Sequence, residues 1–197
     1  MSLEEYKKKR DFEKSPEPKE GEKKSNVKEL AFVVHRHKAS RLHYDFRLES
    51  KGVLKSWAIP KGPSMNPKDK RLSMMVDDHP YDYKDFEGVI PKGTYGAGIV
   101  EIWDKGTYKT LTADKKKPTK GDNLSKYLKN EEVKLSLEGE KLKGEFALVK
   151  IKQRDDNSWL LIKANDEHAV HKKYDPEDLT PEDSPINKEK KSKKKDE

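Results

Sequence analysis

The segment from His43 to Glu49 alternates strictly between polar and apolar side chains, and this pattern constrains the fold more than any other feature of the sequence. On an extended strand the apolar side chains of this segment share one face and the polar ones share the other. The polar face gathers an imidazole, a carboxylate and a guanidinium, each about 6–7 Å from the next along the strand. The segment therefore predicts a strand with one face in a core and the other available for chemistry.

His37 can join His43 and Asp45 only if the chain turns between them. On a straight strand His37 and Asp45 would lie roughly 26 Å apart, and on a helix the three side chains would not share a face. The polar stretch from Lys38 to Leu42 suits the turn. Two imidazoles and a carboxylate are ligands suited to Mn²⁺, Zn²⁺ or Fe²⁺. The alternative is a surface strand with scattered polar residues, because the spacing matches no standard zinc finger.

Composition limits the class of protein. A length of 197 residues fits one domain with tails. Only 31% of the residues are hydrophobic and 41% are charged, so we expect part of the chain to be unpacked. The net charge of +7 favours a polyanionic partner. No apolar run is long enough to span a membrane, and the lack of cysteine agrees with a cytoplasmic location.

Turn-bounded apolar runs predict about seven or eight short strands and a helix, which is typical of an antiparallel barrel or sandwich. The helix candidate is Asp122 to Asn130, with Asp122 or Asn123 as its cap. We expect a mainly β protein, a compact antiparallel β-barrel with one or two short helices and flexible termini. The clearest strand candidates are residues 31–35, 43–49, 53–59, 72–76, 99–103, 133–137, 142–148 and 158–163.

The glycine-rich segment from Ile90 to Gly98 could suggest a phosphate-binding loop. It lacks a Gly-Lys-Ser/Thr ending, and a strand follows where a helix should begin. We therefore interpret it as a bend that leads into the strand from Ile99 to Trp103.

The two ends of the chain are polar and rich in charge. We expect residues 1–9 to form a flexible basic tail, residues 10–172 the folded domain, and residues 173–197 a charged, lysine-rich disordered tail. From composition alone, Arg10 to Glu17 is a linker, unless Phe12 pins it to the domain. The basic run from Lys188 to Lys195 could be a nonspecific nucleic-acid tether.

Several motifs occur in a fixed order along the chain. They are Arg10-Asp11-Phe12, His37 to Leu48, Ser56-Trp57-Ala58-Ile59-Pro60-Lys61-Gly62-Pro63-Ser64, Asp78-His79-Pro80 with Asp82-Tyr83, Phe86-Glu87-Gly88, Tyr95-Gly96-Ala97-Gly98 and Trp159-Leu160-Leu161-Ile162-Lys163. Together they resemble the 3′-phosphoesterase domain of bacterial DNA ligase D. The resemblance covers residues 10 to 170 or so.

This resemblance implies a small β-barrel enzyme that heals 3′ ends during non-homologous end joining. Such an enzyme binds Mn²⁺, with other divalent transition metals as alternatives. It removes a 3′-terminal ribonucleoside and then converts the remaining 3′-phosphate to a hydroxyl. The metal ligands implied are His37, His43 and Asp45. The catalytic residues implied are His79, Arg47, Arg10, Asp11 and Glu17, and the residues implied for phosphate or substrate binding are Ser56, Lys61, Arg71 and Tyr83.

The chemistry of these side chains agrees with that role. Arg47 and Arg71 can hold phosphate oxygens through charge-assisted hydrogen bonds. His79 could donate a proton to the leaving oxygen or stabilise the transition state. Glu17 could orient Arg10 or a ribose hydroxyl, and His35 could be a neighbour of the metal or simply exposed.

The resemblance also implies partners. The expected substrates are DNA or mixed DNA/RNA 3′ ends of a primer-template. Because 197 residues cannot hold a polymerase and a ligase as well, we expect a stand-alone enzyme that works with a separate DNA ligase and polymerase. Two alternatives remain: a noncatalytic nucleic-acid-binding β-barrel, and a broader phosphodiesterase acting on small phosphoesters.

Overall fold

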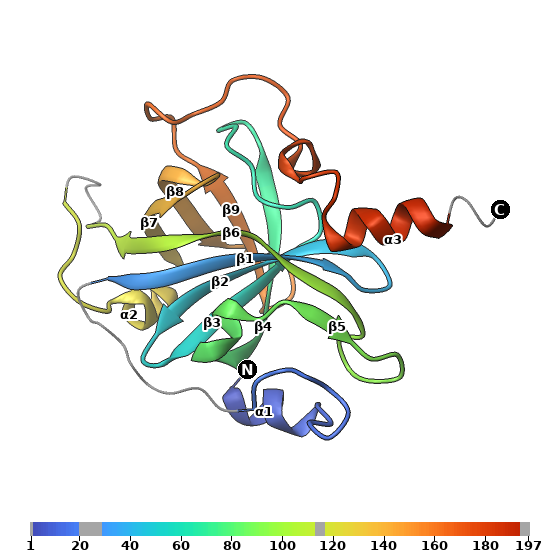
Figure 1. Ribbon diagram of the computed structural model, residues 1–197. Coiled ribbons are helices and arrows are strands. Elements are labelled where there is room, and N and C mark those ends of the chain that lie inside the picture. The colour runs from blue at the N-terminus through green and yellow to red at the C-terminus, as the bar shows by residue number, and fades with distance from the viewer. Residues whose placement is uncertain (1, 20–28, 113–116, 194–197) are drawn as a thin grey trace.

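The sheet closes on itself, because its first strand pairs on both sides. The computed structural model describes residues 2–19, 29–112 and 117–193. The strand order is β1-β2-β3-β4-β9-β8-β7-β6-β5, and β1 also pairs with β6 (Figure 1). Eight antiparallel strands thus form a closed barrel, and β5 is added to the edge of β6. The predicted mainly β, antiparallel barrel is confirmed.

The strands differ widely in length, and most of them are joined by short loops. The strands are β1 (Leu30–Lys38), β2 (Leu42–Ser50), β3 (Val53–Ile59), β4 (Lys70–Pro80), β5 (Gly88–Ile90), β6 (Gly98–Thr110), β7 (Glu132–Gly139), β8 (Lys143–Lys150) and β9 (Ser158–Lys163). The helices are α1 (Leu3–Lys8), α2 (Leu124–Lys129) and α3 (Pro185–Lys193), with the 3₁₀ turns η1 (Tyr81–Asp85) and η2 (Pro176–Leu179). The helix predicted between Asp122 and Asn130 is α2, whereas α1 and α3 raise the number of α-helices above the one or two expected.

The barrel core takes the apolar face of the β1–β2 hairpin. Tyr44, Phe46 and Leu48 are at most 2% exposed and pack in the main core with Trp57 and Trp103. Burying side chains of this size stabilises the fold by about 1.5–3 kcal/mol each. The alternation of β2 therefore has the predicted outcome, and its polar side chains are turned away from the barrel interior.

The first residues of the chain differ from the flexible basic tail expected over residues 1–9. Leu3–Lys8 forms α1, which begins with a capping box between Ser2 and Glu5. Tyr6 of this helix is fully buried and packs in a second apolar cluster with Leu54 and Tyr83. The capping box and the burial of Tyr6 stabilise α1 despite the lysines around it. Composition alone could not reveal either feature.

The end of the chain also differs from expectation. The disordered tail expected over residues 173–197 instead contains η2 and α3, and only its last residues, 194–197, lie outside the described part. Arg36 on β1 is fully buried and pairs with Glu177 at 2.7 Å, and Ile186 is fully buried as well. A buried arginine needs carboxylate partners, so the folded unit extends beyond residue 172.

None of the helices in the described residues has the length and apolar character needed to cross a membrane.

Candidate metal centre and phosphate site

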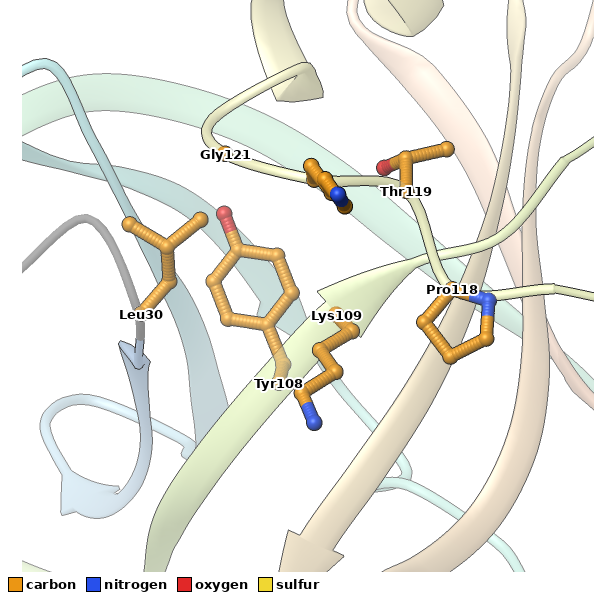
Figure 2. A pocket seen from close by; sticks show the side chains of 7 residues that line it. Leu30, Tyr108, Lys109, Pro118, Thr119 and Gly121 are labelled. Carbon is orange, nitrogen blue, oxygen red and sulfur yellow. The ribbon is translucent and has the colours of Figure 1, made fainter.

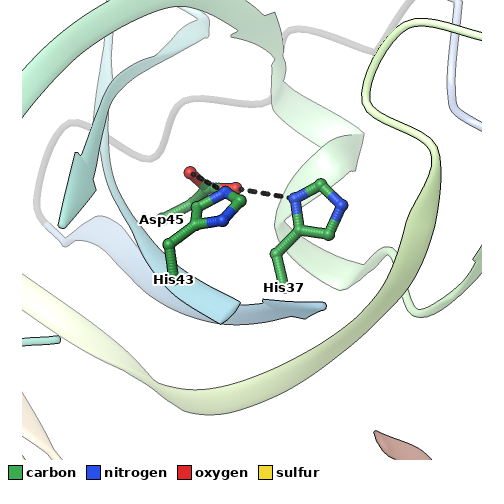
Figure 3. A group of neighbouring side chains, drawn as sticks. All are labelled: His37, His43 and Asp45. Atoms are coloured by element: carbon green, nitrogen blue, oxygen red, sulfur yellow. Dashed lines mark ion pairs between the residues drawn. The ribbon is translucent and has the colours of Figure 1, made fainter. Parts of the chain in front are cut away.

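The β1–β2 hairpin brings His37, His43 and Asp45 together. His37 lies opposite His43 in the strand register. His37 Nδ1 and His43 Nε2 each lie 3.6 Å from a carboxylate oxygen of Asp45, and one ligand atom from each residue falls within 4.8 Å of the others. Figure 3 shows both rings beside the carboxylate, with the ion pairs dashed. The group could hold a metal ion.

In both His37 and His43, the ring nitrogen that faces away from Asp45 makes a hydrogen bond, which leaves the nitrogen that faces Asp45 free for a metal. His37 Nε2 donates to the carbonyl of Gly96 at 2.9 Å, and His43 Nδ1 donates to the carbonyl of Arg41 at 3.0 Å. The unprotonated nitrogens are then the two that face Asp45. Metal-binding histidines commonly donate their other N–H to a carbonyl or carboxylate, so these residues fit a divalent ion with nitrogen and oxygen ligands.

Glycine is required where β6 approaches this hairpin. Gly98 has a φ of 150°, and a Cβ there would lie 2.2 Å from the carbonyl oxygen of Lys38. The glycine-rich bend from Pro91 to Gly98 therefore lets β6 pack directly against the end of β1 that carries His37. This agrees with the interpretation of the segment as a bend into a strand, and no helix follows it.

Arg47 is held on four sides. Its guanidinium donates to Asp45 at 3.0 Å, to Ser56 Oγ at 2.9 Å and to His35 Nδ1 at 3.2 Å, and it lies 4.8 Å from the centre of the Tyr83 ring. Ser56 is fully buried behind the guanidinium, so it positions Arg47 rather than facing the cavity. His35, which could have been exposed, is fully buried and accepts from Arg47.

The charges around Asp45 keep it ionised. Burial alone would raise the pKa of Asp45, but the charge of the nearby Arg47 guanidinium outweighs it and holds that pKa well below its usual range. Burial, aided by the charge of Arg47, lowers the pKa of His35 to about 3, so this imidazole is neutral. A neutral His35 can accept the hydrogen bond from Arg47, and an ionised Asp45 can serve as a metal ligand.

The N-terminal arm, residues 9–17, brings a second arginine to the site. Arg10 Nε donates to Glu17 at 2.9 Å, and its Nη2 lies 3.3 Å from His79 Nε2. The guanidinium stacks 3.8 Å from the centre of the Tyr6 ring. Glu17 is 4% exposed and also accepts from the Tyr83 hydroxyl at 3.0 Å. The arm is thus packed onto the site, and in this structure Glu17 orients Arg10.

His79 is neutral in the free protein. Burial lowers its pKa well below the usual value, and the charges of Arg47 and Arg10 act in the same direction. Because arginine can only donate, His79 Nε2 accepts from Arg10, while Nδ1 donates to the carbonyl of Asp77 at 2.9 Å. In this state the ring carries no spare proton on the side that faces the cavity.

These groups surround a cavity of about 210 Å³. It is lined by Arg10, Arg47 and His79 together with the three metal-type ligands. A larger hollow of about 480 Å³ lies elsewhere, between Leu30, Tyr108 and Pro118 (Figure 2). No histidine or carboxylate is among the described residues that line this larger hollow, whereas the smaller cavity is lined by both.

Three of the residues implied by the resemblance lie away from this cavity. Lys61 and Arg71 line a separate hollow of about 440 Å³, where Arg71 pairs with Asp69 at 2.9 Å. Asp11 is turned outward and pairs with Lys14 at 2.9 Å. Its side chain also accepts from the backbone of Glu13, so Asp11 stabilises the turn of the arm rather than entering the cavity.

Tyr95, which lines the cavity, and Lys9, which lies beside it, were not anticipated from the sequence. Tyr95 lines the cavity although it is 52% exposed, and Lys9 lies 5.5 Å from its ring while pairing with Asp77 at 2.6 Å. The signal for Tyr95 was an aromatic residue inside a glycine-rich bend. Lys9 had no signal, because it is one lysine among several at the start of the chain.

A β-barrel that carries a metal-type ligand group beside two buried arginines defines a phosphoesterase domain, because arginines of this kind hold phosphate oxygens. The chain belongs to the DNA ligase D 3′-phosphoesterase domain family, whose model matches residues 35–150.

Three similar proteins are multifunctional non-homologous end joining proteins named LigD. The one from Pseudomonas aeruginosa is 47% identical over 170 residues, which is 85% of this chain and 19% of that protein. The one from Mycolicibacterium smegmatis is 39% identical over 176 residues, 89% of this chain and 22% of that protein. The one from Mycobacterium tuberculosis is 41% identical over 145 residues, 74% of this chain and 18% of that protein. The chain thus spans about a fifth of the length of these relatives.

Proposed function

We propose that the protein is a metal-dependent 3′-phosphoesterase that heals DNA ends. It removes a 3′-terminal ribonucleoside as a phosphodiesterase and then removes the 3′-phosphate as a phosphomonoesterase, leaving a 3′-hydroxyl. The observation that carries this proposal is the pair Arg10 and Arg47, which face one cavity beside the group of His37, His43 and Asp45. Membership of the phosphoesterase family supports it.

The metal proposed at His37, His43 and Asp45 is Mn²⁺, with other divalent transition metals able to replace it. When bound, the ion supplies a Lewis-acid charge at the phosphate. The donor set of two imidazoles and one carboxylate, with each imidazole fixed by a carbonyl, supports this assignment.

The two arginines have the role of binding and orienting the phosphate. Arg47 is held by Asp45, Ser56 and His35, so little freedom remains to be lost when a phosphate oxygen binds. Arg10 is held by Glu17 in the same way. Charge-assisted hydrogen bonds from such fixed donors are stronger at the negatively charged transition state than in the ground state.

His79 acquires its proton when substrate binds. In the free protein the charges of Arg10 and Arg47 oppose protonation. A phosphate anion placed between these arginines would offset both charges and raise the pKa of His79. The ring could then donate a proton from Nε2 to the leaving oxygen, once Arg10 has transferred its hydrogen bond to the phosphate.

The substrates proposed are DNA or mixed DNA/RNA 3′ ends of a primer-template, and the partners proposed are a DNA polymerase and a DNA ligase that use the healed end. A cytoplasmic location belongs to the same proposal. The names of the end-joining relatives support the repair role.

The test is incubation with Mn²⁺ and a labelled primer-template that ends in a single 3′-ribonucleotide. We expect the labelled strand to be converted first to one with a 3′-phosphate end and then to one with a 3′-hydroxyl end. In the presence of a chelator the labelled strand should remain unchanged. Tight binding without product, across Mn²⁺, Zn²⁺ and Fe²⁺, would instead identify a noncatalytic nucleic-acid-binding barrel. Faster hydrolysis of a small chromogenic ester than of the DNA end would identify a broader phosphodiesterase.

A further inference from the structure

Tyr95 presents an aromatic ring to solvent at the mouth of the catalytic cavity. The side chain is 52% exposed, yet it lines the same cavity as Arg47 and His79. Single exposed aromatic residues are common on protein surfaces. Tyr95 is distinguished by its position, because a phosphate held by the arginines would carry its organic substituents toward this mouth.

The loop that carries Tyr95 is well ordered by its own hydrogen bonds. Thr94 donates to the carbonyl of Pro91 from both its backbone N–H and its hydroxyl, at 3.3 Å and 2.7 Å, and Ala97 donates to the carbonyl of Thr94 at 3.2 Å. The carbonyl of Gly96 accepts from His37. The backbone that carries the ring is therefore fixed relative to the proposed metal centre, which favours a binding platform.

The arm encloses the Tyr95 side of the cavity. Arg10 lies 5.2 Å and Lys9 lies 5.5 Å from the centre of the Tyr95 ring, and Lys9 continues to Asp77 on β4 at 2.6 Å. These contacts border the cavity beside Tyr95, and a terminal unit that ends at this ring need not cross them.

We propose that Tyr95 is the platform on which the base of the 3′-terminal nucleoside stacks, namely the nucleoside that leaves in the phosphodiesterase step. This inference rests on the proposed function and names a specificity-determining residue within it. Stacking on an aromatic side chain suits every base, because each base has a π-face. Tyr95 then selects an end that carries a nucleoside over an end that carries phosphate alone, without selecting a sequence.

A competing role for Tyr95 is to hold the arm, through the cation–π contacts with Arg10 and Lys9. The two roles differ in what they affect. Loss of the arm would slow both hydrolytic steps, because Arg10 contacts the phosphate in each. Loss of the platform would slow only the step whose substrate still carries the terminal base.

The test compares Tyr95→Ala, Tyr95→Phe and the surface control Val89→Ala, which changes a side chain that is 61% exposed on neighbouring β5. Each is assayed with Mn²⁺ on a 3′-ribonucleoside end and on a 3′-phosphate end. For Tyr95→Ala we expect the KM for the ribonucleoside end to rise about 5- to 150-fold. The 3′-phosphate end should change by less than twofold, and Tyr95→Phe and Val89→Ala should resemble the wild type on both.

A substrate with an abasic terminal ribose provides an independent readout. If the base stacks on Tyr95, the KM of the wild type should rise on the abasic substrate by as much as the KM of Tyr95→Ala rises on the intact end. Tyr95→Ala should show no further rise on the abasic substrate. Equal loss by Tyr95→Ala on both ends, or no loss on either, would overturn the assignment of the platform. A wild type that is inactive on both ends would overturn the proposed function itself.

Discussion

Arg10 Nη2 lies 3.3 Å from His79 Nε2, although 69 residues separate them in the sequence. The contact fixes the tautomer of the imidazole, because an arginine cannot accept a hydrogen bond. The arm and η1 also meet here: the Tyr83 hydroxyl donates to Glu17, which pairs with Arg10. Burial raises the pKa of Tyr83 well above its usual value, so this hydroxyl keeps its proton. Arg10 and Glu17 of the arm thus form one hydrogen-bonded unit with His79 and Tyr83.

We expect His79 to remain neutral at pH 6 in the free protein, with its proton on Nδ1. Burial and the charges of Arg47 and Arg10 lower its pKa, whereas the unfolded chain titrates near pH 6.5 or so, the usual value. As the pH falls below that value, the unfolded chain takes up a proton that the folded protein refuses, so the free energy of unfolding decreases. Imidazole ¹⁵N chemical shifts would measure the tautomer and the charge directly.

The matched variant for this prediction is His79→Gln, which keeps a polar side chain but cannot titrate. Its midpoint of thermal unfolding should fall less between pH 7.5 and pH 5.5 than that of the wild type. A charged His79 at pH 6, or identical pH dependence in the two proteins, would contradict the prediction.

We expect His43→Ala to abolish Mn²⁺ binding and activity while the fold remains intact. The His43 side chain is partly exposed and makes its hydrogen bond to a neighbouring backbone carbonyl, so its loss removes a ligand without disturbing the core. Isothermal titration would measure the metal, and circular dichroism the fold. The control is His171→Ala, an exposed histidine outside the cavity. Undiminished metal binding by His43→Ala would rule out this centre.

Glu17→Ala should lower the maximal rate by about 100-fold, because Arg10 loses the acceptor that orients it and no longer meets the phosphate. Glu17 is buried and pairs with Arg10 at 2.9 Å. Deleting residues 1–17 should stop turnover even at saturating DNA. If the truncated protein keeps its maximal rate, the arm is a linker after all.

Asp11 provides the contrast within the same arm. Its carboxylate accepts from the backbone of Glu13, and an amide oxygen can accept in the same way. We therefore expect Asp11→Asn to retain most of the activity and Asp11→Ala to lose more of it. Steady-state rates on a 3′-phosphate end would decide, and an equally severe loss in both variants would show that the charge of Asp11 itself is needed.

Deleting residues 188–197 should raise the DNA concentration needed for half-maximal rate without lowering the maximal rate. The truncation removes the basic run but keeps Ile186, which is fully buried. The dependence of binding on salt should flatten by about 0.9 per lost phosphate contact on duplex DNA. Fluorescence anisotropy at several salt concentrations would measure this slope, and an unchanged slope would show that these lysines do not contact DNA.

Glu101→Gln should reduce the free energy of unfolding by about 3–5 kcal/mol. The variant removes the negative charge that pairs with Arg36 Nη1 at 2.6 Å, and the side chain of Arg36 has no exposed surface. Urea denaturation would measure the loss. The control is Glu132→Gln, which removes an exposed ion pair with Lys134 and should change stability by less than about 0.5 kcal/mol. A loss below 1 kcal/mol or so for Glu101→Gln would mean that Glu177 alone stabilises the arginine.

The sequence predicted those features that depend on patterns among residues close together in the chain. The alternation from His43 to Glu49 identified both the core face of β2 and its polar face, and the turn after His37 brought the three metal-type ligands together. The folded ends of the chain depend on long-range partners instead. Tyr6 is buried because it packs against Leu54 and Tyr83, and no local sequence pattern predicts such a contact.

The same distinction explains which site residues could not be placed from the sequence. Motif order implied that Lys61 and Arg71 share the site with Arg47, but β4 carries Arg71 to a different hollow. Ser56 faces Arg47 from the adjacent strand β3, a pairing that only the register reveals. Side chains far apart in the chain meet through the closure of the barrel, which motif spacing does not encode.

The position of the metal-type ligands on one hairpin has a consequence for handling the protein. His37 and His43 face each other across a loop of a few residues, so little chain entropy is lost in bringing them together. Arg10 reaches His79 only when the arm is docked. A molecule whose arm has detached would therefore still bind the proposed ion. Metal content would then overstate the competent fraction of a preparation, and active-site titration with a substrate end is the measure to use.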